Sequence, residues 1–317
     1  MLEPIFLEAV YKEIIWGGTN FLKMFKRNVS MENIAESWEV CAHDNGTNII
    51  ENGLYKGISL SELFDNKEIK EDIFGIRCIN LEKFPILNKF IDATDKLSVQ
   101  VHPDNNYAKT NENSLGKTEM WYVVSAKENA QLVYGTKENI TKEEFEKAIK
   151  EGNISNTLNY VDVKKGDVLY IPAGTIHAIL DGIIIYEVQQ NSDITYRVYD
   201  WNRLDKLGNS RELHIQKAID VINFNFKGEI QSTKNITKEI ITNEYFKVDK
   251  ICIKEKLFST SDKNTFYAYT VIEGTGILIT NEKEYELNPG ISFIIPASLG
   301  DFEIKTTNIE LIRTSMI

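Results

Sequence analysis

The sequence predicts a mainly β fold with a few short helices. In the clearest strand, LSVQVH at 97–102, apolar residues alternate with polar ones, so that Gln100 and His102 point to the same face. Similar short runs, separated by glycine, asparagine or aspartate, lie at 119–125, 167–174, 182–190 and 194–201. Many strands with turn residues between them are typical of a β-sandwich or a β-barrel.

Three segments carry helix signals. Thr141 and Glu144 form a capping box before an apolar stripe, and Gly152 is expected to follow the end of that helix. Residues 59–65 and 211–220 are shorter helical candidates. Residues 225–240 are polar and lack a clear period, and we interpret them as the connection into a last β domain.

Length and composition limit the possible classes of protein. A chain of 317 residues is long enough for two domains or one elaborated domain, and 42% hydrophobic and 26% charged residues are ordinary for a soluble globular protein. The net charge is -11 and no basic cluster is visible, so we expect no nucleic-acid partner. The composition does not predict an oligomeric state.

The cysteines and the N-terminus bear on location. Three widely spaced cysteines without a CxxC motif suit a reducing compartment, and the acidic residues in MLEPIFLEAVYKE argue against a signal peptide. No run of eighteen apolar residues occurs, so we expect no membrane span. The sequence therefore predicts a cytoplasmic protein.

One short pattern occurs twice. GDVLYIPA at 166–173 reappears as GISFIIPA at 290–297, and in both copies a turn glycine precedes an apolar strand that ends at proline. The repetition suggests two related β units. The second copy has Asp301 where the first has His177, so we expect it to lack that possible metal ligand.

The pattern around His177 predicts the fold more narrowly. Gly166-x5-Pro-x-Gly-x2-His177 resembles the second signature motif of the cupin superfamily, with Asp181 replacing the usual asparagine. The first signature corresponds to Gln100-x-His102, and Glu119 follows only after a longer loop at 103–118. The resemblance implies two cupin-type (jelly-roll) β-barrels. We assign 1–232 to a metal-binding catalytic domain with helical insertions and 233–317 to a cupin-like domain without metal ligands.

The residue types at these positions suit a metal ion. Imidazole nitrogen and carboxylate oxygen bind zinc and similar divalent ions, and with two histidines, an amide and one carboxylate the centre stays positively charged. We predict one divalent ion, expected to be zinc, held by Gln100, His102, Glu119 and His177. A lone strand histidine is more often packed or exposed, which is our interpretation of the other two histidines, His43 and His214. An inward-facing Gln100 amide could instead bond a neighbour.

Several motifs together resemble the type I mannose-6-phosphate isomerase (phosphomannose isomerase) family in its short bacterial form. They are WGG at 16–18, ESWEV at 36–40 with AH at 42–43, LSVQVHPD at 97–104, GKTEMWY at 116–122, YIPAGTIH at 170–177 and TYRVYDW at 195–201. The resemblance implies the interconversion of mannose 6-phosphate and fructose 6-phosphate. It places the family's zinc ligands on the four residues above, its essential arginine on Arg197 and its pocket lysine on Lys117. Met120 departs from the family, where cysteine is common.

The residues themselves leave three points open. Arg197 could hold a substrate phosphate or form a structural salt bridge with Asp193 or Asp200, and its strand alone favours neither. Lys117 on its own reads as an exposed loop lysine. For the general base, a water at the metal, a pocket carboxylate and a histidine are all possible. Two other functions also fit the motifs, namely another metal cupin enzyme such as an oxygenase and a non-catalytic cupin that binds a sugar phosphate.

Overall fold

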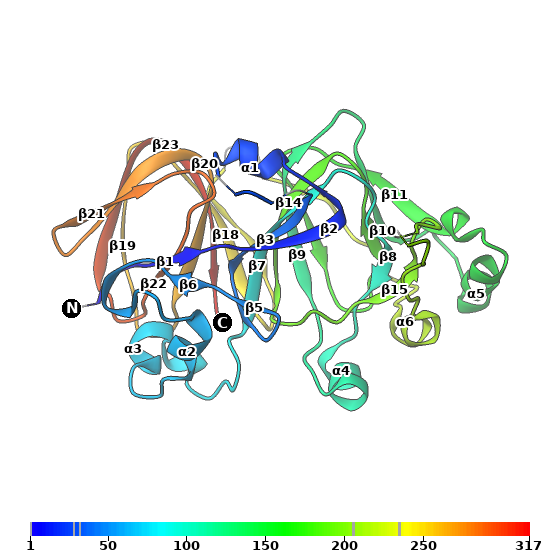
Figure 1. The fold of residues 1–317 in the computed structure, drawn as a ribbon, viewed down its shortest axis with the longest axis horizontal. Helices are drawn as coiled ribbons and strands as arrows, with labels where there is room; N and C mark the ends of the chain where they lie inside the picture. Colours follow the sequence, from blue (N-terminus) through cyan, green and yellow to red (C-terminus); the bar gives the residue numbers. More distant parts are fainter. Residues whose placement is uncertain (1, 28, 32, 205–206, 234–235) are drawn as a thin grey trace.

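Three large antiparallel sheets form most of this computed structural model, which describes residues 2–27, 29–31, 33–204, 207–233 and 236–317 (Figure 1). The predicted mainly β class with few helices is confirmed. In the described part of the chain no sheet closes into a barrel. No described helix is long and apolar enough to cross a membrane.

The nine-stranded sheet combines the C-terminal part of the chain with its beginning. β1 (Ile5–Glu8) pairs with β22 (Ser292–Ile295), so that Phe6 lies opposite Phe293, and β6 (Ile49–Ile50) continues the sheet beyond β1. In order the sheet contains β17 (Lys238–Thr242), β18 (Lys247–Ile253), β23 (Asp301–Ser315), β20 (Tyr267–Thr280), β22 (Ser292–Ile295), β1 (Ile5–Glu8) and β6 (Ile49–Ile50), with β19 (Lys256–Thr260) on β23 and β21 (Lys283–Leu287) on β20.

The other two large sheets come from the middle of the chain. The seven-stranded sheet has the order β16 (Gln231–Ser232), β12 (Asp167–Ile171), β9 (Glu119–Ala126), β14 (Ile183–Gln190), β7 (Ile86–Ala93), β3 (Ile34–Val40) and β2 (Val10–Gly18). The five-stranded sheet has the order β11 (Leu158–Asp162), β10 (Gln131–Thr136), β13 (His177–Ile179), β8 (Val99–Val101) and β15 (Tyr196–Tyr199). A small hairpin joins β4 (Ala42–His43) to β5 (Gly46–Thr47).

Strand alternation divides the seven-stranded sheet between two cores. Along β14, Ile185 packs with Leu132 of the five-stranded sheet, whereas Tyr186 and Val188 belong to a second core that includes Ile312 of the nine-stranded sheet. Successive strand residues point to opposite faces, which explains this division. The seven-stranded sheet is therefore the central layer, and one of its faces is turned toward the five-stranded sheet.

The helices are short and lie around the sheets (Figure 1). They are α1 (Asn20–Met24), α2 (Leu60–Asp65), α3 (Lys70–Phe74), α4 (Asn105–Glu112), α5 (Lys142–Lys150) and α6 (Ile215–Val221), with 3-10 turns at Gly53–Tyr55, Ile76–Cys78 and Ile154–Asn156. α1, α2 and α3 contribute apolar side chains, among them Phe21, Phe64 and Phe74, to the core that contains Tyr186. The predicted capping box of Thr141 and Glu144 begins α5. The helix predicted at 59–65 forms as α2, and the one predicted at 211–220 starts later, at Ile215.

Two sequence-based interpretations need correction. The segment 103–118, expected to be a loop, contains α4, because the Asp104 carboxylate accepts a hydrogen bond from the Tyr107 backbone and caps the helix. The segment 225–240 is more than a connection, because it contributes β16 and the start of β17 to two different sheets.

The sequence repeat corresponds to a structural repeat. Gly166 and Gly290 have φ values of +89° and +85°, which favour glycine, and each precedes an apolar strand, β12 and β22. His177 then begins β13, and Asp301 begins β23 at the matching position. Asp301 is exposed and accepts a hydrogen bond from Thr260. The described residues contain no second cluster of potential metal ligands around it.

Candidate metal centre and pocket

Neighbouring strands place three predicted site residues side by side. In the five-stranded sheet, Gln100 on β8 lies directly opposite His177 on β13 and opposite Arg197 on β15. The Gln100 and His177 side chains point toward each other, with their Nε2 atoms 3.3 Å apart. Strand register thus brings together residues that are far apart in the sequence.

Glu119 reaches the same place from the seven-stranded sheet. It is the first residue of β9, and the segment before it packs against the chain that follows His102. The Lys117 backbone N–H donates to the Pro103 carbonyl at 2.9 Å, and a Cβ on Gly116 would lie only 2.4 Å from the Asp104 carbonyl carbon. Glycine at 116 therefore permits the close approach of these two segments.

His102, Glu119 and His177 form a compact buried cluster. Their potential ligand atoms all lie within 4.8 Å of one another, and each residue is at most 1% exposed. His102 Nε2 lies 3.2 Å from Glu119 Oε1, and His177 Nε2 lies 3.8 Å from Glu119 Oε2. Two imidazoles and one carboxylate therefore converge on a single point.

The second nitrogen of each histidine has a backbone partner. His102 Nδ1 lies 2.7 Å from the Ile194 carbonyl, and His177 Nδ1 lies 2.9 Å from the Thr175 carbonyl. Since a carbonyl only accepts, each Nδ1 carries the proton and each Nε2 presents a lone pair to the cluster. This is the usual arrangement of histidines that bind a metal.

The buried polar atoms of the cluster that lack hydrogen bonds indicate whether it suits a cation. Among the described residues, His102 Nε2 and both Glu119 carboxylate oxygens are buried without a hydrogen bond of good geometry, and only Glu119 Oε1 has a lysine as ion-pair partner, Lys117 Nζ at 2.8 Å. Leaving such atoms without a partner is costly. A divalent cation that accepts nitrogen and oxygen ligands would satisfy all three, so the residues present fit a metal ion.

The surroundings of the cluster favour the protonation states in which its side chains can bind a metal. Burial lowers the pKa of His102 to about 3, with a further contribution from the nearby Lys117 charge, and burial also lowers the pKa of His177. Burial opposes ionisation of Glu119, but the charge of Lys117, whose Nζ lies 2.8 Å from Glu119 Oε1, holds the pKa of Glu119 well below its usual value. The histidines are therefore neutral and the carboxylate is ionised, as metal binding requires.

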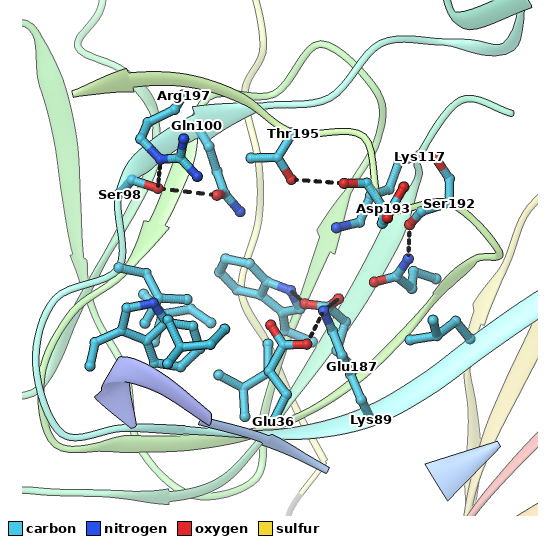
Figure 2. Close-up of a pocket in the computed structure, with 18 of the residues that line it drawn as sticks. Glu36, Lys89, Ser98, Gln100, Lys117, Glu187, Ser192, Asp193, Thr195 and Arg197 are labelled. Carbon is cyan, nitrogen blue, oxygen red and sulfur yellow. Dashed lines mark hydrogen bonds and ion pairs between the residues drawn. The ribbon is translucent and has the colours of Figure 1, made fainter. Parts of the chain in front are cut away.

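A pocket of about 170 Å³ opens beside the cluster, between the seven- and five-stranded sheets (Figure 2). Of the predicted site residues, Gln100, Lys117 and Arg197 line it. His102, Glu119 and His177 lie behind this lining. The pocket walls also contain three tryptophans and several charged side chains, namely Trp16, Trp38, Trp121, Glu36, Lys89, Glu187, Asp193 and Arg211.

The wall opposite Arg197 contains a lysine between two carboxylates. Lys89 Nζ lies 3.3 Å from Glu36 Oε2 and 3.2 Å from Glu187 Oε1 (Figure 2). Trp121 Nε1 donates to the second Glu187 oxygen at 2.7 Å. Burial and the charge of Glu119 raise the pKa of Glu187 to about 7, although Lys89 opposes the shift. A carboxyl with such a pKa in a pocket can exchange protons near neutral pH.

Arg197 does not form the salt bridge with Asp193 or Asp200 that the sequence left open. Its Nε donates to Ser98 Oγ at 3.3 Å and its Nη1 to the Glu212 carbonyl at 2.9 Å. Asp200 pairs instead with Arg211. Among the described residues no carboxylate lies within ion-pair distance of Arg197, so its positive charge remains available to the pocket.

Comparisons with known proteins all identify the same family. The family model for the type I phosphomannose isomerase catalytic domain matches residues 5–122, and the one for the mannose-6-phosphate isomerase cupin domain matches residues 235–316. A putative mannose-6-phosphate isomerase (YvyI) and the mannose-6-phosphate isomerase ManA, both of Bacillus subtilis, are 40% and 39% identical, and each alignment covers 96% of both chains. This chain belongs to the type I mannose-6-phosphate isomerase family. The family assigned from the sequence motifs is thereby confirmed.

Solved structures agree with this family assignment. The crystal structure of the mannose 6-phosphate isomerase from Bacillus subtilis matches with a TM-score of 0.91 at 38% identity, covering 100% of both chains. A putative mannosephosphate isomerase from Archaeoglobus fulgidus matches with a TM-score of 0.81 at 24% identity over 100% of this chain and 99% of that one, which shows the shared fold.

In this member of the mannose-6-phosphate isomerase family, sequence reasoning did not single out Glu36, Lys89 and Glu187. Lys89 and Glu187 lie within two fully buried strands, ILNKFIDA and IIIYEVQQ. A charged residue inside a buried strand is unusual unless it is paired or functional. That signal could have identified both residues, whereas their pairing with each other required the strand register.

Proposed function

We propose that this protein is a metal-dependent aldose–ketose isomerase that interconverts mannose 6-phosphate and fructose 6-phosphate. The observation that carries the proposal is the buried cluster of His102, Glu119 and His177 beside a pocket whose wall contains the unpaired cation Arg197. The names of the relatives support the same reaction. The substrate class is therefore a sugar phosphate.

The metal would be held by His102, Glu119 and His177, with Gln100 as the fourth ligand. The Gln100 side chain lies beside the cluster, with its Nε2 3.3 Å from His177 Nε2. Its amide oxygen is the atom that can bind a metal. Two imidazoles, an amide and a carboxylate suit one divalent ion, and we propose that this ion is zinc. When bound, such an ion supplies Lewis acidity to the oxygens of the sugar.

Arg197 and Lys117 bind the substrate in this proposal. The Arg197 guanidinium is positioned by Ser98 and faces the pocket, so it can hold the phosphate or stabilise negative charge that develops on the sugar oxygens. Lys117 is 5% exposed and lies against Glu119, in contrast to an exposed loop lysine. Its ammonium group can donate to a sugar oxygen that approaches the metal ligands.

Glu187 is our candidate for the general base. The reaction moves a proton between C1 and C2 of the sugar through an enediol. A carboxylate that accepts the proton from one carbon can return it to the other. The Glu187 carboxyl lines the pocket, is held by Trp121 and Lys89, and has a pKa of about 7. These properties match a base that must be regenerated in each turnover.

The domain assignment also remains a proposal. We propose that residues 1–232 form a catalytic cupin-type domain and that residues 233–317 form a second cupin-type domain that has lost its metal ligands. The family model for the cupin domain at 235–316 supports the boundary, and Asp301 at the position that matches His177 supports the loss of ligands. β1 pairs with β22 and β6 pairs with β1, so the catalytic domain contributes two strands to the sheet of its neighbour.

The test is an assay of the purified protein with mannose 6-phosphate, before and after chelation, with fructose 6-phosphate as the readout. We expect turnover without oxygen, loss of turnover after chelation and recovery when a divalent ion is added. Oxygen consumption would instead indicate an oxygenase. Binding of mannose 6-phosphate without turnover in the metal-loaded protein would indicate a non-catalytic cupin.

A further inference from the structure

The β4–β5 hairpin packs against a wall of the pocket without lining it. Its Gly46 lies so close to Trp38 that a Cβ there would be 3.3 Å from Trp38 Cε3. The His43 ring stands perpendicular to the Trp38 ring, with 5.9 Å between their centroids. Lys12 Nζ lies 4.5 Å above the Trp38 ring and donates to the Asn45 carbonyl. The hairpin is thereby fixed to a pocket residue.

Buried hydrogen bonds fix the base of the hairpin. Asn48 is fully buried, and its side chain accepts from the Cys41 N–H at 2.6 Å and donates to the Trp38 carbonyl at 3.0 Å. The Asn191 side chain donates to the Ala42 carbonyl at 3.0 Å. The hairpin is thus joined to the segment that follows β14, which contains Asp193.

The tip of the hairpin contacts Asp193 directly. The Asn45 side-chain amide donates to Asp193 Oδ2, and His43 Nε2 lies 3.8 Å from Asp193 Oδ1. His43 Nδ1 accepts a hydrogen bond from the Asn45 backbone N–H at 3.1 Å, so Nε2 carries the proton and faces the carboxylate. Two polar groups of the hairpin therefore orient one carboxylate.

Asp193 lines the pocket, and its side chain is 47% exposed. Figure 2 shows Asp193 and Arg197 separated along the same wall, with Gln100 and Thr195 between them. A carboxylate repels a phosphate group and accepts hydrogen bonds from hydroxyl groups. The two ends of this wall therefore suit the two ends of a sugar phosphate, with the phosphate at Arg197.

We propose that the β4–β5 hairpin, through Asn45 and His43, positions the Asp193 carboxylate to accept hydrogen bonds from hydroxyl groups of the sugar. Asn45 and His43 are positioning residues, and Asp193 is the group that touches the substrate. The inference rests on the proposed function, because it assumes a sugar phosphate in this pocket. It gives a role to His43, for which the sequence alone predicted only a packed or surface position.

The test compares purified metal-loaded variants of the full chain. N45A removes the donor, and N45D places a negative charge against Asp193. Because one hydrogen bond is lost, we expect N45A to raise KM for mannose 6-phosphate roughly 3- to 10-fold with little change in kcat, and N45D to raise it further. D44A is the matched control, since Asp44 lies at the same hairpin tip and pairs with Lys83 outside the pocket.

A double-mutant cycle separates positioning from a general structural effect. If Asn45 acts through Asp193, N45A changes KM in the wild-type background and has no further effect in the D193A background. Metal content and Tm should match the wild type in N45A and D44A. An N45A effect no larger than that of D44A, or one that persists fully in D193A, would overturn the proposal. Absence of isomerase activity in the wild type would instead refute the proposed function.

Discussion

His102 Nε2 lies 3.2 Å from Glu119 Oε1, although the two residues come from different sheets. His102 directly follows β8 of the five-stranded sheet, and Glu119 begins β9 of the seven-stranded sheet. The candidate metal centre therefore joins the two layers that enclose the pocket. A cation bound there would hold the layers together as well as take part in the reaction.

This arrangement predicts that metal binding stabilises the fold. A ligand that binds only the native state raises the free energy of unfolding by about 2.7 kcal/mol at one hundred times its Kd. We expect chelation to lower Tm by several degrees and a divalent ion to restore it. Scanning calorimetry with and without chelator measures the shift, and an unchanged Tm in a protein shown to lose its metal would contradict the account.

The free charge of Arg197 in the pocket predicts that its removal weakens the reaction with mannose 6-phosphate without changing the metal content. R197A removes a cation from the pocket wall, and hydrogen bonds to charged groups are worth about 1.5–3 kcal/mol. We expect kcat/KM for mannose 6-phosphate to fall roughly 10- to 100-fold while the bound metal stays at the wild-type level. Steady-state kinetics and elemental analysis on the same preparation check this. Unchanged kinetics would show that Arg197 has only a structural role.

The raised pKa of Glu187 predicts a pH dependence. The carboxylate form accepts the proton, so activity should be constant above the pKa of about 7 and fall as the pH drops below it. E187Q should lose turnover by roughly 100- to 10,000-fold and keep its metal, and E187D should retain part of the activity. A pH–rate profile measures this. Retention of the acidic limb in active E187Q would assign the limb to another group.

Much of the fold and of the candidate centre could be predicted from the sequence because the signals were local. The alternation in LSVQVH placed Gln100 and His102 on one face, and the Thr141 capping box placed α5. Other features depend on which strands pair. Nothing near Phe6 indicates that β1 joins the C-terminal sheet, and nothing near Lys89 indicates that Glu187 lies across the ladder. Such pairings are set by packing between distant segments.

Gly116 allows a prediction about stability. G116A would place a Cβ 2.4 Å from the Asp104 carbonyl carbon, and backbone atoms cannot yield as a flexible side chain can. We expect the free energy of unfolding to fall by about 1–3 kcal/mol. We also expect weaker metal binding, because this contact places His102 beside Glu119. G152A is the control, because a Cβ there meets nothing within 4 Å and only its φ of +71° is unfavourable. Equal Tm values for the two variants would contradict this explanation.

The most direct test of the central claim is a metal titration of the chelated protein, followed by fructose 6-phosphate formation from mannose 6-phosphate. The wild type and D301A, which alters the matching position of the second repeat, should recover full activity at one divalent ion per chain. H177A should neither bind the ion tightly nor regain activity. Full turnover in metal-free wild type, or in H177A, would show that His102, Glu119 and His177 do not form a catalytic metal centre.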